Sequence, residues 1–531
     1  MPQKSVSALS SFKPVIFCIL VFELCERLTF YSISANFVRF CTIFLQVDNV
    51  TAMNMSLIFT GSIYIVTLFC GWISDSVLGK FKTIILSGII YFIGVLLITA
   101  VTFQSEPRLN ITLSLTLRRV LTGFGLVFIG IATGGIKSTV GPFGAEQLDQ
   151  KNENITRLFF IWYYWFVNLG SAIAFLGVTY VQQNINFFIG FIIPLVSISV
   201  AMVLFIIPHR FYKRNESFKN TSSIFTYVSI FWEAFQRRSR SIYKYSQFLD
   251  YASLSNGGSY DDTVIADFRK TIRIIPVLLT FIPFYIAYSQ MQSTYLLQAE
   301  RLNLNISTFV IPVASLNVVN TVVILFIIPL LAILVYPILN KCFKASPNHL
   351  KRIALGLFLS SLSVIAAGVL EIYRKDEIRD TGGIPQTVFN KSYNVSHISV
   401  LAQIPQFFFV GSGEVFASAT GLEFAYSQAP VSMQAVITGL FYVMTGIGSF
   451  ASSLLILLVN VNLKDQWMPD DIDKGHYESF FFLLGGIILL DVTIFIFIAR
   501  GYRYSTSEEE KKLLIIYDSR YDDYNKVVSS Q

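Results

Sequence analysis

The chain has 531 residues, of which 53% are hydrophobic, 15% aromatic and only 14% charged, and its mean hydropathy is +0.59. Soluble globular proteins carry about 25% charged residues, so this composition excludes a disordered chain and an ordinary cytosolic enzyme. At about 20 residues for each membrane-spanning helix, the chain has room for a dozen spans and their loops.

Long apolar runs recur from one end of the chain to the other. The first is not expected to be a cleaved signal peptide, because it carries Glu23, Glu26 and Arg27 and no small-residue cleavage site follows it. We therefore predict an all-α membrane protein with twelve transmembrane helices. The runs lie near residues 15–45, 52–74, 83–103, 117–142, 158–182, 186–207, 273–298, 308–338, 349–373, 399–424, 432–461 and 478–500.

The basic residues predict the orientation of these spans. The net charge is +7, and the alternate loops on the N-terminal side hold 25 Lys and Arg against 8 on the opposite side. By the positive-inside rule, both termini are expected in the cytosol, which leaves little basic charge to indicate nucleic-acid binding. Glycosylation patterns (Asn-x-Ser/Thr) that fall in or beside the segments assigned outside start at Asn49, Asn54, Asn110, Asn305, Asn390 and Asn394.

The longest polar stretch divides the chain into two sets of six spans. We expect an N-terminal six-helix bundle (1–207), a cytosolic linker (208–270), a C-terminal six-helix bundle (271–500) and a cytosolic tail (501–531). The linker contains the amphipathic segment SIFTYVSIFWEAF beside Arg237, Arg238 and Arg240, which favours a helix on the membrane surface over a specific docking site. Two halves joined in this way are typical of transporters built from repeats.

Ionisable residues inside a membrane span are costly and therefore indicate function. In the first span, Glu23, Glu26, Arg27 and Tyr31 share one helical face. In the fourth span, Lys137 follows a pair of glycines that permits close helix approach. We expect Lys137 to pair with one of the two acids in a wet cavity; an ion-pair clamp that only holds two helices together is the alternative.

The second half of the chain supplies an acid. Glu414 lies within the tenth span with no cation within two turns. A substrate with a carboxylate at one end and an ammonium at the other would bridge the cations of the first half and Glu414. Glu423, near the cytosolic end, fits a structural role as well as a functional one, and Asp491 is interpreted as packing or gating. Walker, Cys-x-x-Cys and HExxH motifs are absent from the sequence, so we expect neither enzymatic activity nor a bound metal or cofactor. Protons are the coupling ion that we expect.

Several motifs resemble one known family. The segment from Glu23 to Tyr31 is similar to the ExxERFxYY pattern of proton-coupled oligopeptide transporters, solute carrier family 15, in the major facilitator superfamily. The further matching segments are GWISDSVLGKFKTI (71–84), YYWFVNLGS (163–171), QIPQ (403–406) and EFAYSQAP (423–430). Within the family, the chain looks most like the peptide/histidine branch, through SQMQSTY (289–295) and GLFY (439–442). The stretch DKGHYESFF (473–481) is similar to the orphan fifth member.

The resemblance implies the superfamily fold in two six-helix halves and a role for individual residues. Glu23 and Glu26 would couple to protons, and Arg27 and Lys137 would hold the substrate carboxylate, with Glu414 receiving the amine. The other residues implied are Tyr31, Tyr64, Asn168, Tyr295 and Asn320 in the substrate pocket, and Gly71, Asp75, Gly79 and Lys80 in the loop motif. The chain departs from the family at Ser34, Leu57, Ser289 and Thr294, so gate contacts and coupling must differ.

The leading hypothesis is a proton-coupled symporter of di- and tripeptides, with free histidine as a further candidate substrate, working by alternating access in the lipid bilayer. A transporter-shaped sensor or scaffold that recruits a cytosolic signalling adaptor is the first alternative, and a transporter of inorganic anions such as nitrate is the second. The acidic dileucine pattern from Glu509 to Leu514 favours endosomal or lysosomal membranes slightly over the plasma membrane.

Overall fold

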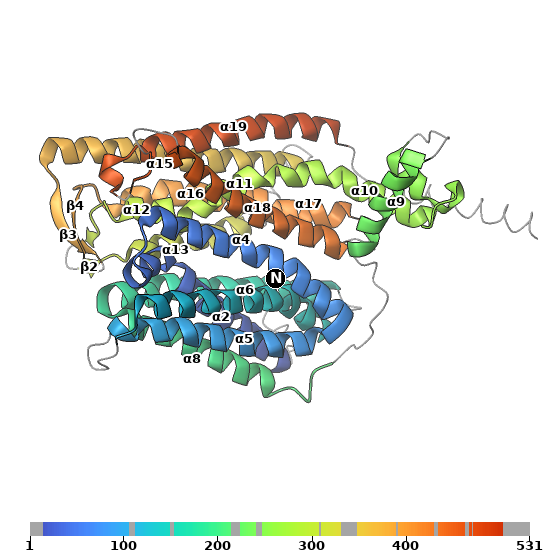
Figure 1. Cartoon of the computed structure of the whole chain (residues 1–531), viewed down its shortest axis with the longest axis horizontal. Helices are drawn as coiled ribbons and strands as arrows, with labels where there is room; N and C mark the ends of the chain where they lie inside the picture. Colours follow the sequence, from blue (N-terminus) through green and yellow to red (C-terminus); the bar gives the residue numbers. More distant parts are fainter. Residues whose placement is uncertain are drawn as a thin grey trace, which may run out of the picture.

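The computed structural model describes residues 14–105, 112–148, 153–213, 224–240, 247–306, 309–330, 348–388, 391–429, 434–461, 467–469 and 471–502. These residues form long helices that run roughly side by side, with most of the blue-to-teal helices in the lower part of the view and most of the yellow-to-red helices in the upper part (Figure 1). The structure therefore confirms the prediction that the chain is mostly helical.

The first 206 residues contribute seven described helices. They are α2 (Pro14–Ser34), α3 (Phe37–Phe40), α4 (Asn49–Ile73), α5 (Lys80–Val101), α6 (Leu115–Glu146), α7 (Glu153–Ile173) and α8 (Phe187–Ile206). The predicted span 15–45 is not one straight helix: α2 ends at Ser34, and the chain turns before α3 and a π-helical turn over Cys41–Leu45.

The predicted linker contains helix α9 (Ile224–Arg240). The helices after it are α10 (Asp262–Leu279), α11 (Phe281–Ser289), α12 (Thr294–Ala299), α13 (Asn317–Leu330), α15 (His349–Thr381), α16 (Ile404–Gly413), α17 (Thr420–Gln428), α18 (Gln434–Val461) and α19 (Tyr477–Gly501). Helix α10 starts inside the predicted linker, because Asp261 caps it and Arg269 forms an ion pair with Asp250 of the linker.

Four short strands lie at the end of the bundle opposite α9 (Figure 1). Strand β1 (Asn305–Ile306) pairs with β2 (Phe309–Val310), and β3 (Ile384–Val388) pairs with β4 (Lys391–Val395), both antiparallel. We call this the hairpin end and the α9 end the linker end.

Ten helical segments of the described chain are long and apolar enough to cross a membrane. The other two predicted positions coincide with α2, which carries three charges, and with the shorter apolar helix Val313–Ile328. The count of twelve and the division into two halves stay predictions. The structure differs from the sequence analysis at Asn54, which lies inside α4 and is 7% exposed, so it is not a loop acceptor for glycosylation in this conformation.

Helices α4 and α18 pack against each other closely along their length. A Cβ atom built on Gly61 would lie 3.0 Å from the carbonyl oxygen of Gly446, so only glycine permits this approach. Toward the hairpin end, the Ser453 hydroxyl donates to Asn54 Oδ1 at 2.6 Å. The same end carries a buried ion pair between Arg39 and Glu300, whose side chains are 5% and 1% exposed. The first and second parts of the chain are therefore joined tightly at the hairpin end.

Candidate functional site

Arg27 organises a buried charge cluster on α2. Its Nε atom lies 3.3 Å from Glu23 Oε1, and it also donates to the Glu26 carboxylate. All three side chains are at most 6% exposed, which confirms that the predicted face of the helix points away from lipid. Two acids thus share one arginine in a medium where unbalanced charge is costly.

The cluster has unused hydrogen-bonding capacity. Across the described part of the chain, Glu23 Oε2, Glu26 Oε1 and Arg27 Nη2 find no hydrogen-bond partner. Buried polar atoms are nearly always paired, so such atoms mark places where a proton, a water molecule or a ligand binds. Arg27 therefore keeps one donor for an anionic group, and each acid keeps one oxygen for a proton.

Helix α7 packs directly against this cluster. A Cβ atom on Gly170 would lie 2.4 Å from the carbonyl oxygen of Leu24 and 3.2 Å from Arg27 Cβ, so glycine is required there. This contact brings the Tyr163 hydroxyl to the Glu23 carboxylate. Asn168, which lies between Tyr163 and Gly170 on α7, donates to the carbonyl of Tyr164 at 2.8 Å and is 7% exposed.

Lys137 approaches the same region from α6. Gly134 and Gly135, just before it, pack against α4 and α5 so closely that a Cβ atom would meet Thr67 N at 3.1 Å and Ser87 Oγ at 2.1 Å. The Lys137 ammonium lies 3.8 Å from the ring centroid of Tyr64 on α4 and 5.4 Å from that of Tyr442 on α18.

The expected pairing of Lys137 with an acid of α2 is not found. Among the residues that the structure describes, Lys137 forms no ion pair within 4.0 Å, although Glu23 and Glu26 lie near enough for an electrostatic interaction. Arg27 occupies both carboxylates, and the two tyrosine rings hold the ammonium through cation–π contacts instead.

Glu414 faces this region from the second half of the chain. It opens a π-helical segment, Glu414–Ala419, between α16 and α17, a distortion that is frequent at functional sites. Asn320 of α13 donates to Glu414 Oε2 at 3.1 Å, and the Tyr288 side chain also reaches this carboxylate. Glu414 lies near enough to interact electrostatically with Lys137, Tyr31 and Tyr64.

The site is thus built from both parts of the chain. Tyr31 on α2, Tyr64 on α4, Lys137 on α6 and Glu414 between α16 and α17 are all partly exposed, and Glu414 interacts electrostatically with the other three. Two cations on one side and one carboxylate on the other can hold a molecule that carries both charges.

Three comparisons with known proteins identify the family of this chain. Residues 81–468 match the family model described as "PTR2: POT family". The chain is 31% identical to Solute carrier family 15 member 3 of Rattus norvegicus, over 93% of this chain and 92% of the relative. The chain belongs to the POT family. Its members are transporters, so the prediction of a transporter rather than an enzyme is confirmed.

Solved POT structures share the fold of this chain. The POT family transporter PepTSo has a TM-score of 0.74 at 23% identity, over 93% of this chain and 99% of that one. A POT family transporter in complex with 5-aminolevulinic acid has a TM-score of 0.66 at 17% identity, over 92% and 96%.

The structure places one predicted pocket residue of this POT chain elsewhere. Tyr295 is fully buried: its hydroxyl lies 2.9 Å from Ser363 Oγ, and its ring packs against Phe407 and Phe481. It is enclosed by the C-terminal helices in this conformation, so its role in binding stays a prediction.

Two further acids lie apart from the site. Glu423 lies near His349 and Arg352 at the linker end, at 3.3 and 3.7 Å, which fits a structural role. Asp491 on α19 is 7% exposed, and its Oδ2 atom has no partner within the described ranges.

The predicted loop motif joins α4 to α5. Gly79 has φ of +78°, a conformation that favours glycine, and Lys80 forms an ion pair with Glu146 at the end of α6. Gly71 lies against Ser138. The side chain of Asp75 lies outside what the structure describes, as does the dileucine pattern of the tail.

Four residues of this arrangement were not predicted from the sequence. Arg39 and Glu300 pair across 261 positions of sequence, which no local pattern indicates. Tyr442 and Tyr288 reach Lys137 and Glu414 only through helix packing. The sequence did contain a signal for Arg39, because an arginine within an apolar run needs an acidic partner.

Proposed function

We propose that this POT family chain is a proton-coupled symporter of di- and tripeptides, with free histidine as a further candidate substrate. One observation carries the proposal: Arg27 has an unused donor near Lys137 in the N-terminal part of the chain, and Lys137 interacts electrostatically with Glu414 of the C-terminal part. The peptide carboxylate would bind Arg27 and Lys137, and its ammonium would bind Glu414 and Asn320. A solved family member binds 5-aminolevulinic acid, which carries the same two kinds of group.

The acids on α2 would couple transport to protons. Each of Glu23 and Glu26 shares Arg27 and keeps one oxygen without a partner among the described residues. Protonation of either acid would weaken its hold on Arg27, and the freed guanidinium would then bind the substrate carboxylate. Proton and substrate would therefore bind in the same conformation and move in the same direction.

Alternating access would consist of two six-helix halves, 1–207 and 271–500, rocking about the site. The Arg39–Glu300 pair and the Asn54–Ser453 hydrogen bond would close the hairpin end in this conformation. Because the basic loops predict cytosolic termini, the hairpin end would face the extracellular space or an organelle lumen. An acidic lumen would then drive peptide export into the cytosol.

Uptake into proteoliposomes under an inward proton gradient tests this function. A labelled dipeptide, histidine and nitrate are compared for the wild type, Lys137→Ala and Glu414→Gln. We expect dipeptide uptake that requires the gradient and falls at least tenfold in both variants, because a charge-assisted contact contributes roughly 1.5–3 kcal/mol.

Arg379→Ala serves as a matched control, because Arg379 is 76% exposed and contacts only Asp376 nearby in the described structure. It should transport as the wild type does. Nitrate uptake without dipeptide uptake would support the anion transporter. Absence of transport for all three compounds by folded protein would favour the scaffold, whose cytosolic adaptor could then be sought by cross-linking.

A further inference from the structure

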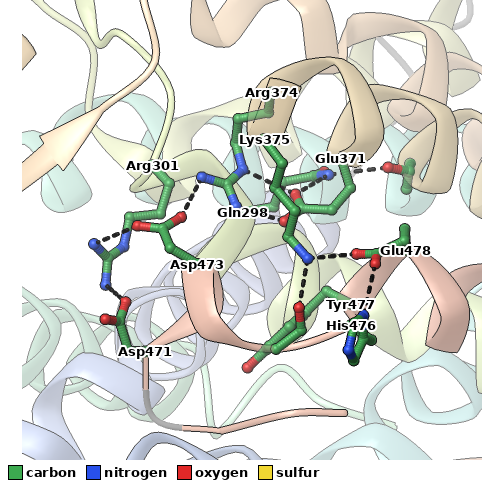
Figure 2. Close-up of polar contacts among 12 residues, drawn as sticks. Gln298, Arg301, Glu371, Arg374, Lys375, Asp471, Asp473, His476, Tyr477 and Glu478 are labelled. Atoms are coloured by element: carbon green, nitrogen blue, oxygen red, sulfur yellow. Dashed lines mark hydrogen bonds and ion pairs between the residues drawn. The ribbon is translucent and has the colours of Figure 1, made fainter. Parts of the chain in front are cut away.

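A second charge cluster lies at the hairpin end and takes no part in the substrate site (Figure 2). Arg374 on α15 donates to Glu371 Oε2 at 3.0 Å and Oε1 at 2.6 Å, and to Asp473 Oδ1 at 2.6 Å. Arg301, just after α12, donates to the other oxygen of Asp473 at 3.3 Å and to Asp471 at 3.1 Å. Asp473 is therefore shared by two arginines.

The centre of the cluster is buried, whereas Asp471 at its edge is 41% exposed. The side chains of Arg374 and Glu371 are 0% exposed, and those of Arg301 and Asp473 are 12% and 29% exposed. Buried charges stabilise a fold poorly compared with apolar groups, but the loss of one partner is strongly destabilising. Such a network fixes the positions of its members more than it adds stability.

The network holds the end of α12 on both sides of Glu300. Two positions before Glu300, Gln298 Nε2 donates to Glu371 Oε2 at 3.0 Å, and Gln403 donates to Gln298 Oε1 at 3.1 Å. Directly after Glu300, Arg301 is bound to the segment Asp471–Glu478. Glu300 itself forms the buried ion pair with Arg39.

We propose that Asp473, together with Arg374 and Arg301, positions Glu300 to receive Arg39, so that the segment Asp471–Glu478 controls closure of the hairpin end. This inference rests on the proposed function in so far as closure belongs to a transport cycle. The segment precedes α19 and includes its first two residues, and it acts on a contact made by α3 and the end of α12. Asp473 is thus a positioning residue, because it touches neither the substrate site nor Arg39.

The physical reason is the geometry of ion pairs. A carboxylate and a guanidinium bind best in a narrow range of orientations, so a small displacement of the α12 end weakens their contact. Loss of the Asp473 charge leaves Arg374 with Glu371 and Arg301 with Asp471, and the tie between α15 and the end of α12 through Asp473 disappears. Loss of the Asp473 charge therefore destabilises the closed state and leaves the open state unchanged.

A thiol-labelling experiment tests the inference without requiring transport. Ser453→Cys, in a background with the five native cysteines replaced, places a reporter that is 4% exposed in the contact between α4 and α18. Its rate of reaction with a charged thiol reagent is measured for the protein in lipid nanodiscs. We expect Asp473→Asn to raise this rate about tenfold, a typical coupling within one ion-pair network.

The matched control is Glu478→Gln. Glu478 lies on the same segment and binds Lys375 at 2.6 Å with similar burial, but Lys375 also binds Gly475 of that segment and not α12. This variant should label at the wild-type rate. An equal rise in both variants would mean general loosening of the loop and would overturn the inference.

A double-mutant cycle separates positioning from a merely structural role. In the background Arg39→Met with Glu300→Met, both charges of the pair are gone while the hairpin end should stay closed, so Asp473→Asn should not raise the rate. An additive increase, or a wild-type rate for Asp473→Asn alone, would sink the idea. Arg301→Lys provides a second variant should Asp473→Asn fail to fold, and it should also raise the rate. Failure of peptide uptake with these labelling results intact would refute only the proposed function.

Discussion

The ion pair between Arg39 and Glu300 gives the sharpest test of how this chain closes. The perturbation is a set of three variants: Arg39→Met, Glu300→Met and the double substitution. Both side chains are buried, at 5% and 1% exposure, and they join α3 to the end of α12. The single variants each leave one charge behind, whereas the double variant leaves none.

The expected magnitude follows from desolvation. Breaking a buried pair by removing one partner costs about 3–5 kcal/mol, whereas replacing both ions with apolar groups is often close to neutral. When the hairpin end opens, the remaining charge is hydrated, so the penalty falls on the closed state alone. At about 1.4 kcal/mol for each factor of ten, the single variants should shift the equilibrium toward opening by about 10²- to 10⁴-fold.

Reaction of Ser453→Cys with a charged thiol reagent reports this equilibrium. Both single variants should react at a rate near that of an open protein, and the double variant should return close to the wild type. Arg269→Met, which removes an ion pair of the linker, is the control and should not change the rate. If the double variant is as reactive as the single ones, the pair acts through something other than charge burial.

Two further predictions concern the substrate site. Gly170→Val should destabilise the protein by more than about 3 kcal/mol in thermal unfolding, because its Cβ atom would overlap the carbonyl oxygen of Leu24. Gly177→Val is the control and should be near neutral, because nothing lies within 4 Å of a Cβ atom there. Equal effects of the two substitutions would contradict the packing argument. Tyr442→Leu should weaken dipeptide binding about two- to fivefold, because a cation–π contact to Lys137 contributes about 0.5–1 kcal/mol, whereas Tyr442→Phe keeps the ring and should bind normally.

Local sequence patterns predicted which helix face carries the charged residues of α2. The helical spacing of Glu23, Glu26 and Arg27 placed them on one face, because side chains three and four positions apart are neighbours on a helix. The structure confirms that this face is buried, and it shows in addition that Arg27 binds both acids. The glycines before Lys137 were likewise interpreted as sites of close helix approach, and the structure shows that approach.

Partners across long stretches of sequence were not predictable. Lys137 was expected to form an ion pair with an acid of α2, but Arg27 already binds both carboxylates. The Lys137 ammonium instead contacts the rings of Tyr64 on α4 and Tyr442 on α18. The competition between two cations for the same acids depends on helix crossing and depth. Neither quantity is encoded in the spacing of residues along one helix.

That this chain is a helical membrane protein with charges in its apolar runs could be predicted from local patterns, because hydrophobic length and helical periodicity are local properties. Which charges meet depends on the packing of the folded chain. Arg39 pairs with Glu300, and Asp473 joins two arginines, through contacts between residues that lie 99 to 261 positions apart in the sequence. Ion pairs need an approach within a few ångströms, and only the packing of the folded chain sets such distances.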